Sequence, residues 1–243
     1  VGMVLQILFS ILGGVVTDKL GRRLTTLIFD LASWSGATLL WALSGKFEHF
    51  LIAAALNASM RIPMNSWTGL LAEDAKKEQI VQIYTLIYIS GLGAAFFSPL
   101  SGILVNRYGI VPTVRVLYMF AFVLMTTKII ALYFLTTETE VGRTRMSETK
   151  GVSIFKLLGQ YGGVMHHILK SPPTLVTLGL MLVMNIVGVV NGTFWTLYAA
   201  ENLGVPQGLI PLFPFLKSIA MLIAFFTFVP RVHTDRFRHP MFV

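Results

Sequence analysis

Long runs of hydrophobic residues dominate the chain, and polar or charged segments separate them. A helix needs about 20 mainly apolar residues to cross the hydrocarbon of a bilayer, where no water can satisfy backbone polar groups. Seven stretches approach this length, and each predicts a membrane-spanning helix: 1–17, 24–45, 50–71, 81–104, 112–135, 174–199 and 209–229. The short connections between most of them disfavour a set of buried helices in a large soluble protein. The pattern therefore predicts an all-α, polytopic membrane protein.

One connection, residues 136–173, is longer than the others and begins with a polar run that ends at Lys150. Apolar residues then recur at helical spacing, and Ser153 stands where a helix cap is expected. This pattern predicts an amphipathic helix that lies on the membrane surface. His166 and His167 could suggest a metal site, but adjacent helical residues point in different directions, so we predict no bound metal.

The composition agrees with a membrane location. Hydrophobic residues make up 55% of the 243 residues and charged residues 12%, about half the charged share of a soluble domain. Without cysteine, the chain can form neither a disulfide nor a thiolate-bound metal site. The net charge of +8 raises the possibility of nucleic-acid binding, which the placement of the basic residues argues against.

Lysine and arginine gather on one side of the predicted spans, as they do in cytoplasmic loops. With loop 18–23 inside, only Lys46, Arg107 and Arg115 lie outside. The residues expected inside are Lys19, Arg22, Arg23, Lys76, Lys77, Arg143, Arg145, Lys150, Lys156, Lys170, Arg231, Arg236 and Arg238. We therefore expect a plasma-membrane protein with the first loop and the 136–173 linker in the cytoplasm, and no nucleic-acid partner.

The first loop, residues 14–23, has the sequence GVVTDKLGRR. Gly14 allows a neighbouring helix to approach closely, and Gly21 permits a tight reversal. Asp18 can form ion pairs with the basic residues, and making or breaking such pairs would distinguish two conformations.

This ordered set resembles the signature loop between helices two and three of the major facilitator superfamily. The resemblance implies twelve helices in two halves and a loop that latches the cytoplasmic side, a role that falls here on Asp18, Arg22 and Arg23. The family also places an acidic residue of helix four near the loop arginine. We expect Asp74 to pair with Arg22, with Glu73 as the alternative. The other residues assigned to the latch are Gly14, Lys19 and Gly21.

Two more segments are similar to family motifs. Gly91, Gly93, the Ser98–Pro99 pair and Gly102 resemble the glycine–proline motif of helix five, although Ser98 replaces a glycine. Segment 232–240 echoes the signature loop without its glycines. The resemblance covers family helices two to eight, so we expect a fragment: residues 1–135 form an amino-terminal half without its first helix, 136–173 the linker, and 174–243 the start of the second half.

Polar residues within the third predicted span suggest a solute cavity. On one continuous helix, Asn57, Arg61, Asn65 and Thr68 would share a face at i, i+4, i+8 and i+11. A charge within the membrane is costly and marks a functional candidate, and amides around an arginine suit a polar or anionic solute. The alternative is an arginine paired structurally with a neighbouring helix.

Three further residues are cavity candidates. In the sixth span, Asn185 and Trp195 flank Gly188 and Gly192, whose spacing also fits a helix-packing seam. In the seventh, Lys217 follows Pro211 and Pro214, which we expect to break the helix near the lysine.

Asp30 and Lys128 lie at similar predicted depths, roughly 9 and 11 Å from the cytoplasmic ends of their spans. The resemblance places them on helices that are usually peripheral. We predict a structural ion pair within the membrane.

Together these features predict a secondary transporter that moves a small-molecule solute through the lipid bilayer by alternating access, coupled to protons or sodium. We expect no catalytic residue and no cofactor. Multidrug efflux is an alternative function. A seven-helix receptor or channel and a membrane-embedded enzyme are weaker ones, since the sequence has no nucleotide loop, His-Glu-x-x-His motif or nucleophile elbow.

Overall fold

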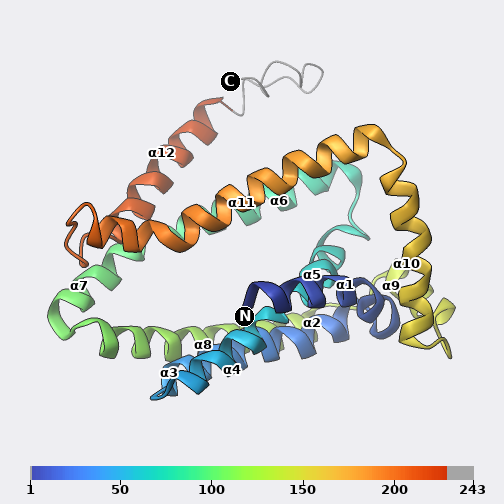
Figure 1. Cartoon of the computed structure of the whole chain (residues 1–243), viewed down its shortest axis with the longest axis horizontal. Helices are drawn as coiled ribbons and strands as arrows, with labels where there is room; N and C mark the ends of the chain where they lie inside the picture. Colours follow the sequence, from blue (N-terminus) through green and yellow to red (C-terminus); the bar gives the residue numbers. More distant parts are fainter. Residues whose placement is uncertain (1, 229–243) are drawn as a thin grey trace. The chain divides into compact units, whose positions relative to one another are not determined.

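The computed structural model describes residues 2–228, without the side chains of residues 3, 77–78, 160–162, 164–168, 193 and 228. All regular secondary structure in this part is helical (Figure 1). The elements are α1 Gly2–Leu20, α2 Arg22–Asp30, the π-helix η1 Leu31–Gly36, α3 Ala37–Leu43, α4 Phe47–Ala58, α5 Arg61–Ala72, α6 Lys77–Ala95, α7 Ser98–Tyr108, α8 Ile110–Leu135, α9 Glu140–Glu148, α10 Ile154–Leu169, α11 Pro172–Glu201 and α12 Leu212–Phe228. Segment 232–240 and the side chains of His166 and His167 lie outside the described residues.

Four helical stretches are long and apolar enough to cross a membrane: Arg22–Leu43, Gln79–Tyr108, Ile110–Leu135 and Pro172–Gly192. A shorter apolar stretch covers Leu212–Thr227. The all-α class is confirmed for the described residues, whereas seven spans and a twelve-helix fold remain predictions. The helix expected over 136–173 is present as α10, preceded by a short helix, α9.

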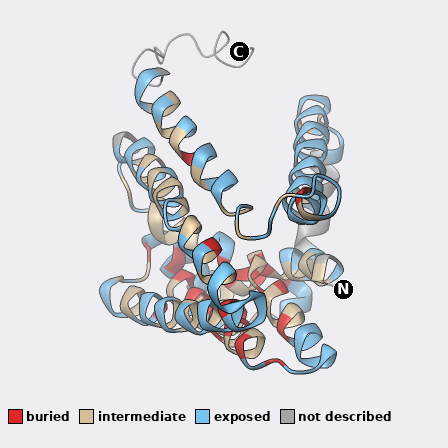
Figure 2. Ribbon diagram, turned by 90° about the vertical axis from the view of Figure 1, so that its left-hand side faces the viewer, coloured by how far each residue is buried: buried red, intermediate tan, exposed pale blue. Residues whose placement is uncertain are grey.

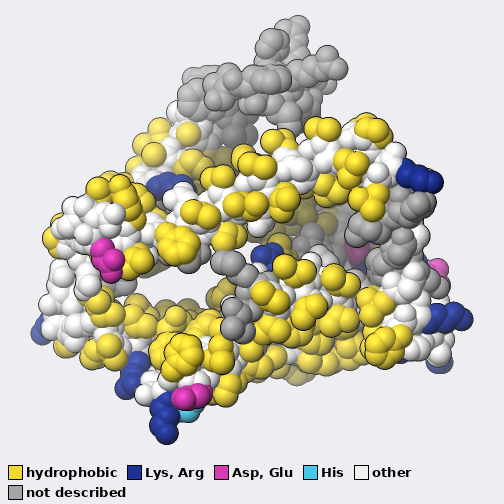
Figure 3. Space-filling model, viewed as in Figure 1, with side chains coloured by type: hydrophobic (Ala, Val, Ile, Leu, Met, Phe, Trp, Pro, Cys, Tyr) yellow, Lys and Arg dark blue, Asp and Glu magenta, His cyan; other side chains and the backbone are white. Residues whose placement is uncertain are grey.

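The chain forms two compact units, each described separately below. The first contains Val1–Ile80 and Val114–Asn185, and the second contains Val81–Thr113 and Ile186–Val243. The helices carry many exposed large hydrophobic side chains, which cover much of the surface in Figure 3. Such a surface is unfavourable in water and suits contact with lipid. The division at residues 135 and 173 stays a prediction.

Small side chains form much of the core of the first unit. Ala37, Ala53 and Ala58 are buried together with several serines and threonines, shown red in Figure 2. In this unit α5 packs against α1 and α2. A Cβ atom at Gly13 of α1 would lie 3.2 Å from the Arg61 carbonyl oxygen, so glycine permits the close approach of α1 and α5.

The third predicted span is interrupted between α4 and α5. Pro63 has no N–H to bond the Ser59 carbonyl, which accepts instead from the Ile62 N–H at 2.9 Å. The prediction of one continuous polar face from Asn57 to Thr68 is therefore wrong, because the two helices meet at a turn at Ser59 and Met60.

A similar interruption occurs in the second unit, between α6 and α7. Pro99 stands in the first turn of α7, and the Ser98 hydroxyl contacts the Ala95 and Pro211 carbonyl oxygens, both at 2.7 Å. A Cβ atom at Gly102 would collide with the Gly208 carbonyl oxygen. The glycine–proline segment thus packs against the chain before α12, and its small residues permit that contact.

Candidate functional site

The turn between α1 and α2 depends on glycine. Gly21 has φ 82° and ψ 168°, a conformation that residues with a Cβ atom rarely adopt. A Cβ atom here would also lie 2.5 Å from the Glu138 carboxylate and 2.6 Å from the Met146 sulfur. Gly21 therefore ends one helix, starts the next, and leaves room for a segment from far along the chain.

Arg22, the first residue of α2, is only 7% exposed and contacts two carboxylates. Its Nη2 lies 2.9 Å from Glu73 Oε1, and its Nε donates to both Glu73 oxygens at 3.0 Å. Its Nη1 lies 3.3 Å from Asp18 at the end of α1. The buried guanidinium therefore links the ends of α1, α2 and α5 through charge-assisted hydrogen bonds.

Glu138 caps the amino terminus of α2 from the beginning of the linker. Its two carboxylate oxygens accept the backbone N–H groups of Arg22 and Arg23 at 2.9 and 3.0 Å. The first N–H groups of a helix have no partner within it and carry partial positive charge, so a carboxylate stabilises them. A residue 116 positions later thus supplies the cap that the α1–α2 turn lacks.

Thr139 connects this cap to the ion pair. Its hydroxyl donates to Glu73 Oε2 at 2.6 Å and accepts the Gly142 N–H at 2.9 Å, which caps α9. Asp18, Arg22, Glu73, Glu138 and Thr139 thus form one connected set, which we call the loop network.

Further contacts hold the linker against the same turn. The Thr149 hydroxyl donates to the Asp18 carbonyl oxygen at 3.1 Å, and Lys19 Nζ donates to the Val152 carbonyl oxygen at 2.9 Å. Arg23 Nε donates to the Tyr133 carbonyl oxygen, and the Arg23 guanidinium carbon lies 4.0 Å from the centre of the Tyr133 ring. A cation over an aromatic face is an attractive arrangement.

The expected partner of Arg22 was wrong in its position by one residue. Glu73, the alternative, pairs with Arg22, whereas the exposed Asp74 accepts the Glu140 N–H at 3.3 Å. Neighbouring residues on a helix point about 100° apart, so only one of them faces Arg22. Both carboxylates nevertheless contact the network or the linker beside it.

The cavity candidates of α4 and α5 face different partners. Arg61 Nε donates to Gln6 of α1 at 3.0 Å, whereas the Asn57 amide donates to the Ser33 carbonyl oxygen of η1 at 3.0 Å. Asn65 is exposed, and the Thr68 hydroxyl donates to the Met64 carbonyl oxygen within α5. The structure thus separates Asn57 from Arg61, for which the break at Ser59 is responsible.

The other cavity candidates are exposed. Asn185 lies in the first unit, and Trp195 in the second contacts Phe213 edge-to-face with ring centres 5.5 Å apart. A Cβ atom at Gly188 or Gly192 would meet no described residue within 4 Å. The expected helix break near Lys217 was also wrong: α12 begins at Leu212, accommodates Pro214 in its first turn, and continues past the lysine.

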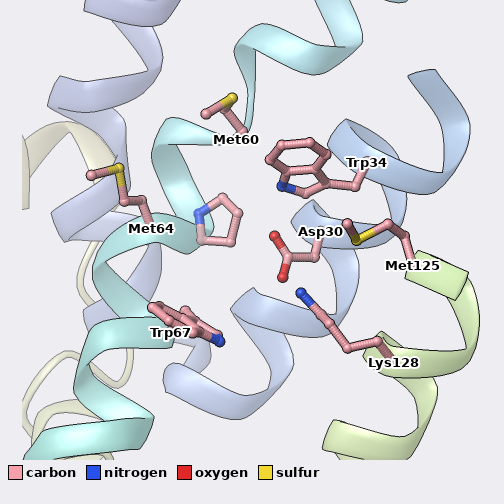
Figure 4. Close-up of a pocket in the computed structure, with 8 residues that line it drawn as sticks. Asp30, Trp34, Met60, Met64, Trp67, Met125 and Lys128 are labelled. Carbon is pink, nitrogen blue, oxygen red and sulfur yellow. The ribbon is translucent and has the colours of Figure 1, made fainter. Parts of the chain in front are cut away.

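Asp30 and Lys128 come together, but not as a close ion pair. Both line one pocket of the first unit, and their charged groups point toward each other in Figure 4. Among the described residues the pairs within 4.0 Å are Arg22–Asp18, Arg22–Glu73 and Arg145–Glu148. Asp30 and Lys128 thus lie at the same pocket, as a pair requires, but the predicted direct ion pair is not formed within 4.0 Å.

Comparison with known proteins gives one clear match. The model of the Major Facilitator Superfamily matches residues 1–243. Neither the curated proteins nor the solved structures contain a match to the chain. Because the family match covers the whole sequence, the resemblance of the first loop is confirmed, and the protein belongs to the Major Facilitator Superfamily of integral membrane transporters.

Proposed function

We propose that the protein is a secondary active transporter that moves a small solute by alternating access, driven by a proton or sodium gradient. The observation that carries the mechanism is the loop network, in which buried Arg22 joins the ends of α1, α2 and α5. Hydrogen bonds and ion pairs of this kind weaken steeply with distance and angle, so they are made in one arrangement of the helix ends and lost in another.

The loop network acts as a latch on the cytoplasmic side of the plasma membrane. Glu73 faces Arg22, and Thr139 bonds the same Glu73 carboxylate, so the linker takes part in the latch. When the latch is closed, the helix ends stay together and the solute path opens outward. The linker at 136–173 joins an amino-terminal half, 1–135, to the second half that starts at 174.

The solute path includes Arg61 and the exposed Asn65, with Asn57, Asn185, Trp195 and Lys217 as further candidates. The polar contact between Arg61 and Gln6 at the junction of α1 and α5 supports this proposal, since a guanidinium among apolar helices requires a polar partner. A polar or anionic solute would compete with Gln6 for the guanidinium.

Transport is tested by reconstituting the intact protein in liposomes and measuring uptake and efflux of a chemically diverse solute panel under imposed proton and sodium gradients. Arg61→Ala should abolish gradient-driven flux with folding unchanged, and Arg61→Lys should retain little of it. Arg145→Ala is the matched control, because Arg145 is exposed and its ion-pair partner among the described residues is Glu148, three residues away. Normal flux in Arg61→Ala would remove Arg61 from the solute path.

The latch is tested by the accessibility of a single cysteine at Asn65. Glu73→Gln and Arg22→Gln should each increase labelling from the cytoplasmic side, whereas Asp74→Asn should have little effect. Because Glu73 and Arg22 are in contact, the double variant should be less than additive. Equal effects of the two acidic variants would contradict the assignment of Glu73.

Multidrug efflux is the second candidate function. The observation that favours it is the aromatic and methionine lining of the pocket beside Asp30, which suits a hydrophobic solute. Efflux of organic cations, in preference to polar solutes of the same panel, would support this function over solute uptake.

A further inference from the structure

A pocket of about 200 Å³ in the first unit is unconnected with the loop network. Three helical segments surround it, α2 continuing into η1, α5 with the turn before it, and α8 (Figure 4). Its walls are formed by Trp34, Met60, Pro63, Met64, Trp67 and Met125, and its charged groups belong to Asp30 and Lys128. At about 30 Å³ per water in the liquid, the volume corresponds to roughly seven water molecules, enough for a small organic solute.

The Asp30 carboxylate has no hydrogen-bond donor in the part of the chain that the structure describes, although the residue is only 6% exposed. Buried polar groups are almost always paired, and an unpaired carboxylate is especially costly. The indole N–H groups of Trp34 and Trp67 likewise have no described acceptor. The pocket therefore holds a carboxylate that faces Lys128 without an ion-pair contact within 4.0 Å, and two indole N–H groups that are free to bind an acceptor.

The backbone beside Asp30 has an unusual conformation that other helices hold in place. The π-helix η1 begins directly after Asp30 and contains Trp34. The Asn57 amide of α4 bonds the Ser33 carbonyl oxygen, and the Thr126 hydroxyl of α8 bonds the Ser35 hydroxyl at 2.9 Å. Short π-helical turns within α-helices occur frequently at functional sites. Asp30 and Trp34, four residues apart at this turn, both line the pocket.

The charges of the pocket favour a ligand that carries both signs. A solute that carries only a positive charge would be attracted by Asp30 but repelled by the facing Lys128. A solute that carries only a negative charge would be attracted by Lys128 but repelled by Asp30. A zwitterion satisfies both groups. The two tryptophans offer aromatic faces to an ammonium group, and the methionines and Pro63 accept an apolar portion.

We propose that this pocket binds a small zwitterion, with its ammonium group at Asp30 and its anionic group at Lys128. The chemistry has two possible sources, a free solute such as an amino acid and the headgroup of an ethanolamine phospholipid. Binding does not depend on transport, so the inference stands apart from the proposed function and is tested without a gradient.

The experiment uses tryptophan fluorescence of the intact chain in nanodiscs made of phosphatidylglycerol, which carries no ammonium group. The chain has four tryptophans, and the Trp41→Phe and Trp195→Phe changes leave Trp34 and Trp67 as reporters. Three ligands with the same branched apolar group are titrated: leucine, 3-methylbutylamine, which lacks the carboxylate, and 4-methylpentanoate, which lacks the amine. We expect a saturable change with leucine and at least about tenfold weaker binding of the amine and the acid, the factor for about 1.4 kcal/mol.

Variants assign the two charges. Asp30→Asn should weaken leucine binding at least about tenfold, and Lys128→Gln should reverse the preference, so that 3-methylbutylamine binds more tightly than leucine. Arg145→Gln, outside the pocket, should change neither affinity. If Asp30→Asn fails to fold, as judged by gel filtration, the reversal in Lys128→Gln still decides the matter. Similar affinities for all three ligands, or an unchanged preference in Lys128→Gln, would overturn the proposal.

A second set of nanodiscs, containing phosphatidylethanolamine, distinguishes the sources. Weakened leucine binding in these nanodiscs would show that the lipid headgroup competes for the same site. A fluorescence change on adding that lipid, sensitive to Asp30→Asn and without any response to leucine, would assign the site to the lipid. An absence of response to both would refute binding of a zwitterion here.

Discussion

Arg22 shows how a single buried charge organises the end of a helix bundle. Its guanidinium contacts Asp18 and Glu73, while its backbone N–H is capped by Glu138. Removing one partner of a buried charge costs more than the pair contributes, because the remaining group keeps its desolvation penalty. The residue therefore makes the loop network sensitive to each of its acidic members.

We predict that Glu73→Ala lowers the thermal stability of the purified protein by about 2 kcal/mol, the usual worth of a hydrogen bond to a charged group. Of the ion pairs in the described part of the chain, the Arg22 guanidinium would retain the longer one, to Asp18. Asp74→Ala is the matched control and should change stability little, since Asp74 is exposed and accepts one backbone N–H. The midpoint of thermal unfolding in detergent is measured for both variants. Equal shifts of the two midpoints would show that the pair of Arg22 and Glu73 contributes no stability.

For Glu138→Ala we predict a loss of about 1 kcal/mol, the cost of removing a helix cap. Two backbone N–H groups of α2 would lose their acceptor, and the helix end would lose a compensating negative charge. Glu140→Ala, two residues away and exposed, makes the same chemical change outside the cap. Hydrogen exchange of the Arg22 and Arg23 amides should rise in the first variant alone.

The sequence predicted part of this site. The position of Gly21 between two apolar runs, next to Asp18 and Arg22, indicated a tight, charged turn. Glu138 gave no comparable signal, because a glutamate in a polar run has many possible roles and its contact spans 116 residues. Glu73 and Asp74 differ only in helical phase, which sequence spacing cannot define at a frayed helix end.

At the scale of the elements, the α1–α2 turn requires glycine at position 21 for two reasons: the positive φ and the lack of room for a Cβ atom. Gly109 shares the first reason and not the second, so it serves as a control. Gly21 and Gly109 have nearly the same backbone conformation, φ 82° and 81° with ψ 168° in both. A Cβ atom at Gly21 would collide with Glu138 and Met146, whereas one at Gly109 would meet no described residue within 4 Å.

We predict that Gly109→Ala costs about 1–3 kcal/mol from backbone strain alone. Gly21→Ala should cost more, because the methyl group also displaces Glu138 from the α2 terminus. Thermal unfolding of both variants gives the difference. A Gly21→Ala variant as stable as Gly109→Ala would mean that the linker approaches the turn less closely than described.

The helix interruptions were only partly predictable. Pro63 was visible within the third span, yet its hydrophobic run suggested a continuous helix, and the break at Ser59 separated Asn57 from Arg61. The π-helix η1 has no sequence signature, because it depends on tertiary hydrogen bonds from α4 and α8. The local hydrophobic pattern therefore predicted that these segments are helical. Long-range contacts determine where the helices are interrupted and which partners their polar residues contact.

For the whole molecule, the asymmetric distribution of lysine and arginine predicts an orientation that can be measured. Lys46, Lys76, Lys150 and Asn202 are exposed, so a single cysteine at any of them should be reactive where reagent reaches it. An impermeant maleimide added to intact cells should label Lys46→Cys and Asn202→Cys but not Lys76→Cys or Lys150→Cys. Labelling of Lys76→Cys before lysis would reverse the orientation.

The cap on α2 also has a consequence for biosynthesis. A ribosome adds about 5–20 residues per second, so Glu138 leaves it roughly 6–23 s after Arg22, from which it is separated by 116 residues. During that interval α1 and α2 enter the bilayer with the amino end of α2 uncapped and Arg22 lacking the neighbours that reach it from the linker. The folding of this part of the chain thus stays incomplete until α8 and the start of the linker have been made. A released chain truncated just before Glu138 would present a first loop more open to proteases than one truncated after Val152.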